Sequence, residues 1–352
     1  MPDRVLVTGG AGFIGSHLCE ALARDGAEVW VLDNFDDHYS PESKRRNLVS
    51  MASRPDVHVV EGDVRDMVLT GGLFSDVGFD AVVHLAALPG VEASMDNPDT
   101  SYEVNVRGTL RLLESMGRHG LRRLVLLSSA AVYGTDTPAP FAEDGAADRP
   151  VSPYGAGKRA AELLAHSYHR LHDLSVHCLR PFTVYGPRQR PEMAIHTFAR
   201  LLREGEPVSL HGDGSSLRDY VHVSDVVDGI RLSLEHLLER DEAVYEAVNI
   251  GSGEPVALEK LVSLLGDAMG VDPVVDHVSR KPWRSEVTHA SLDKARELLG
   301  YRPTVELPEG LADFVAWFRS DGARFNGDGS GSASDVSGDR APATKAKRRP
   351  VP

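Results

Sequence analysis

Short apolar runs alternate with longer stretches of helical periodicity over the first half of the chain. Runs at residues 5–7, 27–32, 57–60, 81–85, 124–127 and 176–179 have the length and the aliphatic character of strands. Between them, residues 94–117 and 153–171 are expected to form long helices, the first with an apolar stripe at helical spacing. This alternation predicts an α/β protein with a doubly wound parallel sheet, whose ligands bind at the carboxyl ends of the strands.

The pattern changes after Pro181, where glycine, proline and charged residues become frequent and the elements become shorter. We therefore expect a first domain over residues 1–181 and a smaller C-terminal α/β lobe over 182–320, partly interleaved with it. The last helix is expected at 311–318. Residues 321–352 are mostly small and polar and end in a basic cluster, which predicts a disordered tail.

The first strand ends in a glycine-rich turn, VLVTGGAGFIGSH, that leads directly into a helix. Its spacing, Gly10-x-Gly12-x-x-Gly15, fits a dinucleotide fingerprint, and Gly9 extends it to a short-chain-dehydrogenase variant. A turn with few side chains lets backbone N–H groups at a helix N-terminus approach a pyrophosphate. Glycines alone often mark only a turn, but a strand before them and a helix after them favour the dinucleotide site.

An acid stands at the end of the second strand, about 20 residues past the glycines, where a dinucleotide site needs one. The carboxylate of Asp33, beside Asn34, can accept hydrogen bonds from ribose hydroxyls and repels a 2′-phosphate, so NAD is favoured over NADP. The alternative interpretation is an ordinary helix-capping aspartate. Asp63, after the third strand, is within reach of the adenine amino group. Ala86 and Ala87, after the fourth strand, leave room for a flat cofactor.

Composition narrows the classes of partner and the compartment. The net charge of −14 argues against non-specific nucleic-acid binding, and no apolar run is long enough to span a membrane. Cys19 and Cys178 lie inside apolar patterns, which favours packed thiols in a reducing compartment over a disulfide. The first strand follows the initiator methionine closely, so no signal peptide is expected and we predict a soluble, cytoplasmic protein. The 15 histidines lack ligand spacing, so we predict no metal.

A tyrosine and a lysine four residues apart begin the helix after the fifth strand. Tyr154 and Lys158 would lie on one helix face, and a neighbouring ammonium lowers the pKa of a phenol. Such a tyrosine can take a proton from a sugar alcohol as the alcohol is oxidised, with Ser129 bonding the same hydroxyl. The pair alone is a weak signal, because chance matches are common. Its position after the glycine turn, Asp33 and a strand-end serine makes it a catalytic prediction.

These motifs together resemble an extended short-chain dehydrogenase/reductase of the nucleotide-sugar epimerase kind. The matching segments are residues 8–15, 33–34, 84–87, 102–110, 128–134, 154–158, 179–187 and 217–225. The resemblance implies a Rossmann-type lobe that binds NAD and a C-terminal lobe that binds a nucleotide sugar. The implied NAD contacts are Gly9, Gly12, Phe13, Ile14, Gly15, Asp33, Asn34, Asp63, Val64, Leu85, Ala86, Ala87, Asn105, Tyr154 and Lys158.

Two stretches, 33–48 and 182–194, resemble UDP-glucuronate 4-epimerases in particular. By that resemblance, Thr183 and Arg190 would contact the sugar carboxylate, whereas an Arg190 that caps a loop or lies in solvent is the alternative. The implied substrate contacts are Pro89, Ser129, Thr183, Arg190, Ser209, His211, Arg218 and Arg284. The predicted reaction is transient oxidation at C4 of a UDP-sugar. The alternatives are a 4-epimerase of neutral UDP-sugars and, in a different class, a non-catalytic NAD sensor.

The segment after Ser129 separates epimerases from relatives that eliminate water or lose CO₂. Those relatives resemble one another in carrying acids after the catalytic hydroxyl residue, whereas this chain has Ala130, Ala131 and Val132. No carboxylate is therefore present there for elimination chemistry. The resemblance also implies a homodimer that pairs through helices at about 94–118 and 153–171.

Overall fold

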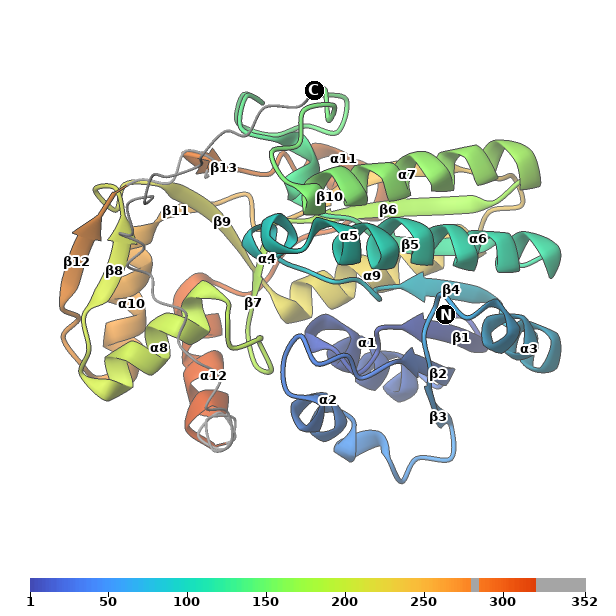
Figure 1. The fold of residues 1–352 in the computed structure, drawn as a ribbon, viewed down its shortest axis with the longest axis horizontal. Helices are drawn as coiled ribbons and strands as arrows, with labels where there is room; N and C mark the ends of the chain where they lie inside the picture. Colours follow the sequence, from blue (N-terminus) through green and yellow to red (C-terminus); the bar gives the residue numbers. More distant parts are fainter. Residues whose placement is uncertain (280–284, 321–352) are drawn as a thin grey trace, which may run out of the picture.

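The computed structural model describes residues 1–279 and 285–320, and its centre is a seven-stranded parallel sheet (Figure 1). The spatial order is β10-β6-β5-β4-β1-β2-β3, so the direction of winding reverses beside β1. The strands are β1 (Arg4–Thr8), β2 (Glu28–Asp33), β3 (Val57–Glu61), β4 (Ala81–His84), β5 (Arg123–Leu127), β6 (Ser175–Pro181) and β10 (Tyr245–Ile250). The predicted Rossmann-type sheet is confirmed, and a crevice is expected where the winding reverses.

Helices cover both faces of this sheet and bury a core on each side. Alternate side chains of β1 face opposite ways: Val5 and Val7 join one core, and Leu6 joins the other. The first core includes side chains of α1 (Phe13–Arg24), α9 (Val223–Leu238) and α11 (Asp293–Leu299). The second includes side chains of α3 (Met67–Val77), α6 (Thr109–Arg118) and α7 (Pro153–His172). Burial on both faces explains why the strands are almost uniformly apolar.

The continuous helix expected over residues 94–117 is instead broken into four pieces. These are α4 (Val91–Asp96), α5 (Pro98–Tyr102), the π-helical η2 (Glu103–Gly108) and α6. Pro98 has no N–H to continue α4, and the Asn97 side chain accepts from the Thr100 backbone N–H, which starts a new helix. Within the π turn, the Thr109 hydroxyl donates to the Asn105 carbonyl at 2.7 Å.

The second lobe has its own small sheets and a third apolar core. Its strands are β7 (Thr183–Tyr185), β8 (Val208–His211), β9 (Leu217–His222), β11 (Pro255–Ala257), β12 (Val275–Val278) and β13 (Val287–Thr288). Its helices are α8 (Ala194–Glu204), α10 (Leu258–Met269) and α12 (Leu307–Ser320). The short helices α2 (Pro41–Asn47), η1 (Val49–Met51) and η3 (Ala130–Tyr133) belong to the first lobe. Because α9, β10 and α11 return to the large sheet, the chain crosses between the lobes several times.

The structure also bears on the predictions made for the cysteines, for membrane-spanning segments and for the C-terminal tail. Cys19 and Cys178 are both free and buried, as expected for packed thiols. Over the described ranges, no helix is long and apolar enough to cross a bilayer. The predicted disordered tail, 321–352, lies outside the described residues.

The loop after β7 is fastened to helix α1 of the first lobe. Arg188 adopts a left-handed backbone conformation (φ 64°), which is costly for a residue with a Cβ. Its guanidinium donates to Glu20 Oε1 at 2.7 Å, and both side chains are about four-fifths buried. One residue earlier, the Pro187 carbonyl lies 2.9 Å from His17 Nε2. These contacts fix the path of the loop, which continues to Arg190.

Glu20→Gln should therefore destabilise the protein, because it leaves the Arg188 charge partly buried without its carboxylate. We expect a loss of about 2 kcal/mol in the free energy of unfolding, measured by urea denaturation at neutral pH. The matched control is Glu204→Gln, which breaks an exposed pair with Arg200 and should cost less than about 0.5 kcal/mol. Equal effects of the two substitutions would contradict the fastening role.

His177 of β6 is a buried histidine beneath helix α9. Its ring is tilted by 36° against that of His236, with 4.9 Å between centroids, and neither of its ring nitrogens has a hydrogen-bond partner among the residues described. Burial is the main cause that lowers the pKa of His177 to about 3, and nearby His236, Lys294 and Arg240 add to the effect. The ring is therefore neutral in the folded protein at neutral pH.

This pKa predicts a loss of stability in acid. The unfolded chain takes up a proton at His177 below about pH 6.5, while the folded chain does so only near pH 3, so stability falls as the pH falls between these values. His177→Leu should remove this dependence. The free energy of unfolding of the variant minus that of wild type should therefore be about 2 kcal/mol higher at pH 5 than at pH 7.5. Urea unfolding at the two pH values measures it. The exposed control His172→Leu should track wild type, and a His177→Leu curve parallel to wild type would refute the assignment.

Candidate active site

A cavity of about 440 Å³ lies at the carboxyl ends of the central strands, where the two lobes meet. It lies at the crevice that the reversal of winding predicts. Most of the residues singled out in the sequence line it together. They are Gly9, Gly12, Phe13, Ile14, Gly15, Asp33, Asn34, Asp63, Val64, Leu85, Ala86, Ala87, Pro89, Ser129, Tyr154, Lys158, Thr183 and Arg190.

The floor of the cavity is the glycine turn between β1 and α1. Gly9 has φ 72°, and a Cβ there would lie 2.6 Å from the Ala86 backbone nitrogen. A Cβ on Gly15 would lie 2.3 Å from the Gly9 carbonyl oxygen. Helix α1 begins after Gly12 without any side-chain cap, so its first N–H groups are not used by a capping side chain. This bare, positive helix end fits a pyrophosphate.

Two aspartates stand on the adenosine side of the floor. Asp33 is buried; its carboxylate accepts from Ala11 N at 3.0 Å and from Phe35 N at 2.9 Å. Burial raises the pKa of Asp33, against the effect of these two bonds. Asp63 accepts from Asn34 Nδ2 and from the Nε and Nη2 of Arg65, and the bonds from Arg65 lower the pKa of Asp63. Both carboxylates are thus fixed in position at the ends of β2 and β3.

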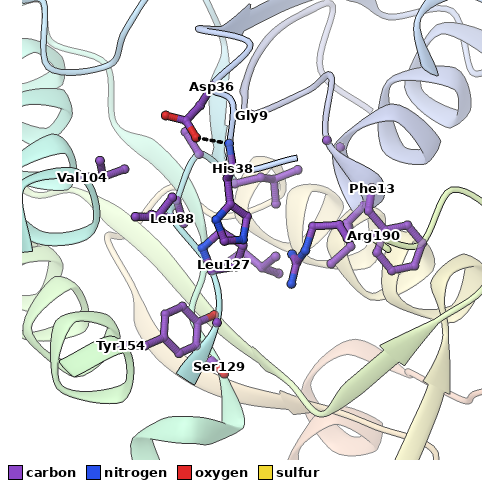
Figure 2. A pocket seen from close by; sticks show the side chains of 18 of the residues that line it. Gly9, Phe13, Asp36, His38, Leu88, Val104, Leu127, Ser129, Tyr154 and Arg190 are labelled. Carbon is purple, nitrogen blue, oxygen red and sulfur yellow. Dashed lines mark hydrogen bonds between the residues drawn. The ribbon is translucent and has the colours of Figure 1, made fainter. Parts of the chain in front are cut away.

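The start of α7 brings the catalytic candidates into the cavity. Ser152 caps the helix by accepting from Gly155 N at 3.1 Å, and Tyr154 N donates to the Ser94 hydroxyl at 3.1 Å. One turn on, Lys158 donates to the Leu127 carbonyl at 2.8 Å. Figure 2 shows Tyr154 and Ser129 on the same side of the cavity. Hydroxyl, phenol and ammonium groups therefore meet at the end of β5.

The pKa of Tyr154 corrects one sequence prediction. The spacing predicts a phenol whose pKa is lowered by Lys158, but burial raises the pKa of Tyr154 in the structure. The opposing influences are a hydrogen bond with Ser129 and the charge of Arg190. Lys158 turns its ammonium to the Leu127 carbonyl instead, and burial lowers its own pKa to about 8. Desolvation of both groups outweighs their helical proximity.

A buried ion pair that the sequence analysis did not single out supports this strand end. Glu162 accepts from Arg180 at 2.9 and 2.8 Å and from the Ser128 hydroxyl at 2.6 Å. Its charge also works to raise the pKa of Lys158, one helical turn away. The available signal was an acid four residues after Lys158, on the same helix face. The pair fixes Ser128, and with it the backbone that carries Ser129.

The loop after β2 supplies cavity residues that sequence reasoning also did not assign. Asp36, His38, Tyr39 and Lys44 line the cavity opposite the catalytic helix. The Asp36 carboxylate accepts from His38 N at 2.9 Å, as Figure 2 shows, and its carbonyl accepts from Lys44 Nζ at 2.6 Å. The ammonium of Lys44 lies 4.9 Å from the Tyr39 ring centre. Residues 33–48 carried the family resemblance, but nothing in their spacing indicated which side chains turn inward.

The second lobe contributes Thr183 and Arg190 from β7 and the loop that follows it. Arg190 points into the middle of the cavity, between Phe13 and Tyr154 in Figure 2. Its side chain is 20% exposed, which excludes an arginine in open solvent. The loop contact of the other alternative is present, since the Nε of Arg190 donates to Glu192 two residues along. Its charge also works to lower the pKa of Tyr154. A cation therefore faces the candidate base across the cavity.

Some predicted contacts lie outside the cavity lining. Asn105 is buried in η2, where its side-chain amide donates to the Leu88 carbonyl at 2.9 Å and accepts from Leu88 N at 2.7 Å. It therefore holds the segment after β4. The outer positions on the second lobe are Ser209 and His211 on β8 and Arg218 on β9.

Arg218 and His211 both contact backbone carbonyls of residues between β12 and β13. Strand β9 pairs with β7 so that Tyr220 is opposite Thr183, which places Arg218 two residues from that pairing. Its guanidinium donates to the Ser285 carbonyl at 2.6 Å. His211 Nδ1 lies 2.9 Å from the Ser279 carbonyl. Arg284, the other predicted arginine, lies outside the described residues.

Within residues 1–279 and 285–320, no group of three or more histidine, cysteine or carboxylate side chains is placed to hold a metal ion. The cavity instead offers a bare helix end, a buried carboxylate at the end of β2, a phenol with a hydroxyl beside it, and a guanidinium. Together these groups fit a dinucleotide and an anionic, hydroxylated second ligand.

Comparison with known proteins agrees with this geometry. Residues 5–251 match the model of the NAD dependent epimerase/dehydratase family. A UDP-glucuronate 4-epimerase of Thermodesulfobacterium geofontis is 36% identical over 313 residues, which are 89% of this chain and 95% of that protein. UDP-glucuronate 4-epimerase 3 of Arabidopsis thaliana is 38% identical over 328 residues, 89% of this chain and 76% of that one.

A solved structure has the same architecture along nearly its whole length. The UDP-glucuronic acid 4-epimerase of Bacillus cereus, in complex with UDP-glucuronic acid and NAD, matches with a TM-score of 0.83 and 33% identity. The match covers 90% of this chain and 99% of that one. The fold, the cavity and these comparisons lead to one conclusion: this chain belongs to the NAD dependent epimerase/dehydratase family.

Proposed function

We propose that this protein is an NAD-dependent 4-epimerase that converts UDP-glucuronate to UDP-galacturonate. One observation carries the proposal: a single cavity is lined by the glycine turn, by Ser129 and Tyr154, and by the Arg190 guanidinium. These groups match a dinucleotide, a sugar hydroxyl and a sugar carboxylate, respectively. The relatives that carry the name UDP-glucuronate 4-epimerase support the same substrate.

The residues present fit NAD in the inner half of the cavity. The glycine turn would take the pyrophosphate, since the close backbone packing at Gly9 and Gly15 excludes side chains there. Asp33 would take the adenosine ribose hydroxyls, and its charge disfavours a 2′-phosphate. When bound, NAD supplies the hydride acceptor and donor for the sugar C4 carbon.

Tyr154 is the residue that would take up and return the proton of the sugar hydroxyl. Its phenol oxygen would take the proton of the C4 hydroxyl as that carbon is oxidised, and return it when the carbon is reduced from the other face. Burial raises the pKa of Tyr154, so the phenolate needs support from nearby donors and cations. Ser129 and Arg190 act in that direction, and Lys158 places a buried ammonium one helical turn away.

The wall beside Ser129 favours epimerisation over elimination. The turn after it is η3, whose Ala131 lines the cavity with a methyl group. Elimination at a neighbouring carbon needs a second acid or base near the sugar, and Ala130 and Ala131 offer none.

Thr183 and Arg190 would hold the sugar carboxylate, while Ser209, His211 and Arg218 of the second lobe would face the uridine diphosphate. Pro89 would border the sugar on the opposite side.

A conversion assay tests this function directly. Purified protein incubated with UDP-glucuronate, without added NAD, should form UDP-galacturonate, resolved by chromatography. Tyr154→Phe should lower kcat by about 10²- to 10⁴-fold, because the C4 hydroxyl loses its base. Tyr168→Phe, a matched control near the far end of α7, should keep the wild-type rate. Full activity of Tyr154→Phe, or no conversion of UDP-glucuronate by wild type, would contradict the proposal.

We also propose a cytoplasmic location. It is supported by two buried cysteines that remain free thiols, the state expected in a reducing compartment. A tagged copy should fractionate with cytosolic markers, and its recovery outside the cell would count against this location.

The homodimer is a further part of the proposal. Helices α5 and α6 follow one another in a row, and α7 lies beside this row (Figure 1). Tyr102 on α5 is 59% exposed and Leu163 on α7 is 53% exposed, so the row and α7 each present a large apolar side chain to solvent. A two-fold axis over these helices would bury both side chains in each copy.

Leu163→Glu should therefore shift the protein from dimer to monomer in sedimentation velocity, because the interface would bury two uncompensated carboxylates. Val49→Glu is the matched control, since Val49 is 66% exposed on η1, whose Met51 joins the core on the other side of the sheet. The idea would be abandoned if wild type sediments as a monomer or if both variants behave alike.

A further inference from the structure

Arg190 is held from one side by an acidic neighbour two residues along the same loop. Its Nε donates to Glu192 Oε1 at 2.6 Å, and this is the only hydrogen bond of the guanidinium within the described part of the chain. The terminal nitrogens of Arg190 project into the cavity in Figure 2. Glu192 itself is not part of the cavity lining and is 44% exposed on its side chain.

The same carboxylate oxygen also approaches the first lobe. His38 Nε2 lies 3.5 Å from Glu192 Oε1, and the backbone of His38 is fixed by the Asp36 carboxylate. Partial burial works to raise the pKa of Glu192, but the contacts with His38 and Arg190 outweigh it and lower the pKa to about 2. Glu192 is therefore an anion at neutral pH. It lies between His38, on a loop of the first lobe, and Arg190, on a loop of the second.

The contact at Nε limits how Arg190 can bind a ligand. A guanidinium can pair with a carboxylate through Nε and one terminal nitrogen, or through both terminal nitrogens. Glu192 occupies the Nε–H, so the end-on edge is the one left for a ligand in the cavity. The His17 and Glu20 contacts fix the loop at Pro187 and Arg188, and the bond from Nε to Glu192 sets the orientation of the guanidinium on that loop.

We propose that Glu192 is a positioning residue for substrate specificity: it aims the end-on edge of Arg190 and thereby favours a sugar that carries a carboxylate over a neutral one. This inference rests on the proposed epimerase function. The positioning role can be separated from a simple charge effect, because the negative charge of Glu192 on its own repels the carboxylate of the substrate. A charge effect alone would make Glu192 weaken the binding of UDP-glucuronate, whereas positioning makes Glu192 strengthen it.

The two possibilities predict changes of opposite sign in KM. With positioning, Glu192→Ala should raise KM for UDP-glucuronate about 10-fold, and Glu192→Gln, which keeps an acceptor for Nε, should raise it less. The kcat for UDP-glucuronate and the KM for UDP-glucose should change less than about 2-fold in either variant. Glu204→Gln, an exposed glutamate on α8, is the control for loss of one negative charge.

A double-mutant cycle with Arg190→Ala shows whether Glu192 acts through the guanidinium. In the Arg190→Ala background, adding Glu192→Ala should leave KM for UDP-glucuronate unchanged, because the group to be aimed is gone. A KM that falls or stays constant in Glu192→Ala alone, or that rises equally for UDP-glucose, overturns the positioning role while the epimerase function stands. Wild type that shows no preference for UDP-glucuronate overturns both.

Discussion

The close contact of backbone with backbone at the first βα turn is the constraint on which the rest of the site depends. Gly9 lies against the backbone of Ala86 at the end of β4, and Gly15 lies against the Gly9 carbonyl, so neither position has space for a Cβ. This contact brings the N-terminus of α1 to the sheet edge without any side chain over it. Other groups of the site lie around that bare edge: Asp33 at the end of β2, Ser129 after β5, and Tyr154 on helix α7.

Charge is buried around this edge in pairs and networks. Glu162 and Arg180 are nearly inaccessible to solvent and satisfy each other with two hydrogen bonds, and Glu162 takes a third bond from Ser128. Removing one partner of such a pair would leave an uncompensated charge, so the pair fixes a local arrangement more than it adds stability. The fixed arrangement is the end of β5, to which Lys158 is also tied through the Leu127 carbonyl.

The sequence was informative where local pattern alone decides structure. Glycine spacing, aliphatic runs and the Tyr154–Lys158 interval predicted the sheet and the groups at its carboxyl edge, because parallel strands place their ends at one edge. Thr183 and Arg190 were predicted only from the family resemblance. The prediction failed where long-range packing decides. Nothing local placed β10 in the large sheet. The break before Asn105 did have a local signal, Asn97 followed by Pro98, which the apolar stripe of the segment outweighed in the prediction. The pKa of Tyr154 likewise depends on burial, which helical spacing cannot convey.

The cation at Arg190 links recognition of the substrate to the chemistry. Its charge is one of the influences that lower the pKa of Tyr154, and it is also the group that we propose binds the sugar carboxylate. A carboxylate bound to Arg190 neutralises much of that charge, so less of it remains to stabilise a phenolate. With a uronate substrate, support for the Tyr154 anion then depends more on Ser129 and on the buried ammonium of Lys158. The Glu162 carboxylate matters for this reason: it works to keep Lys158 protonated in a site whose burial lowers the lysine pKa to about 8.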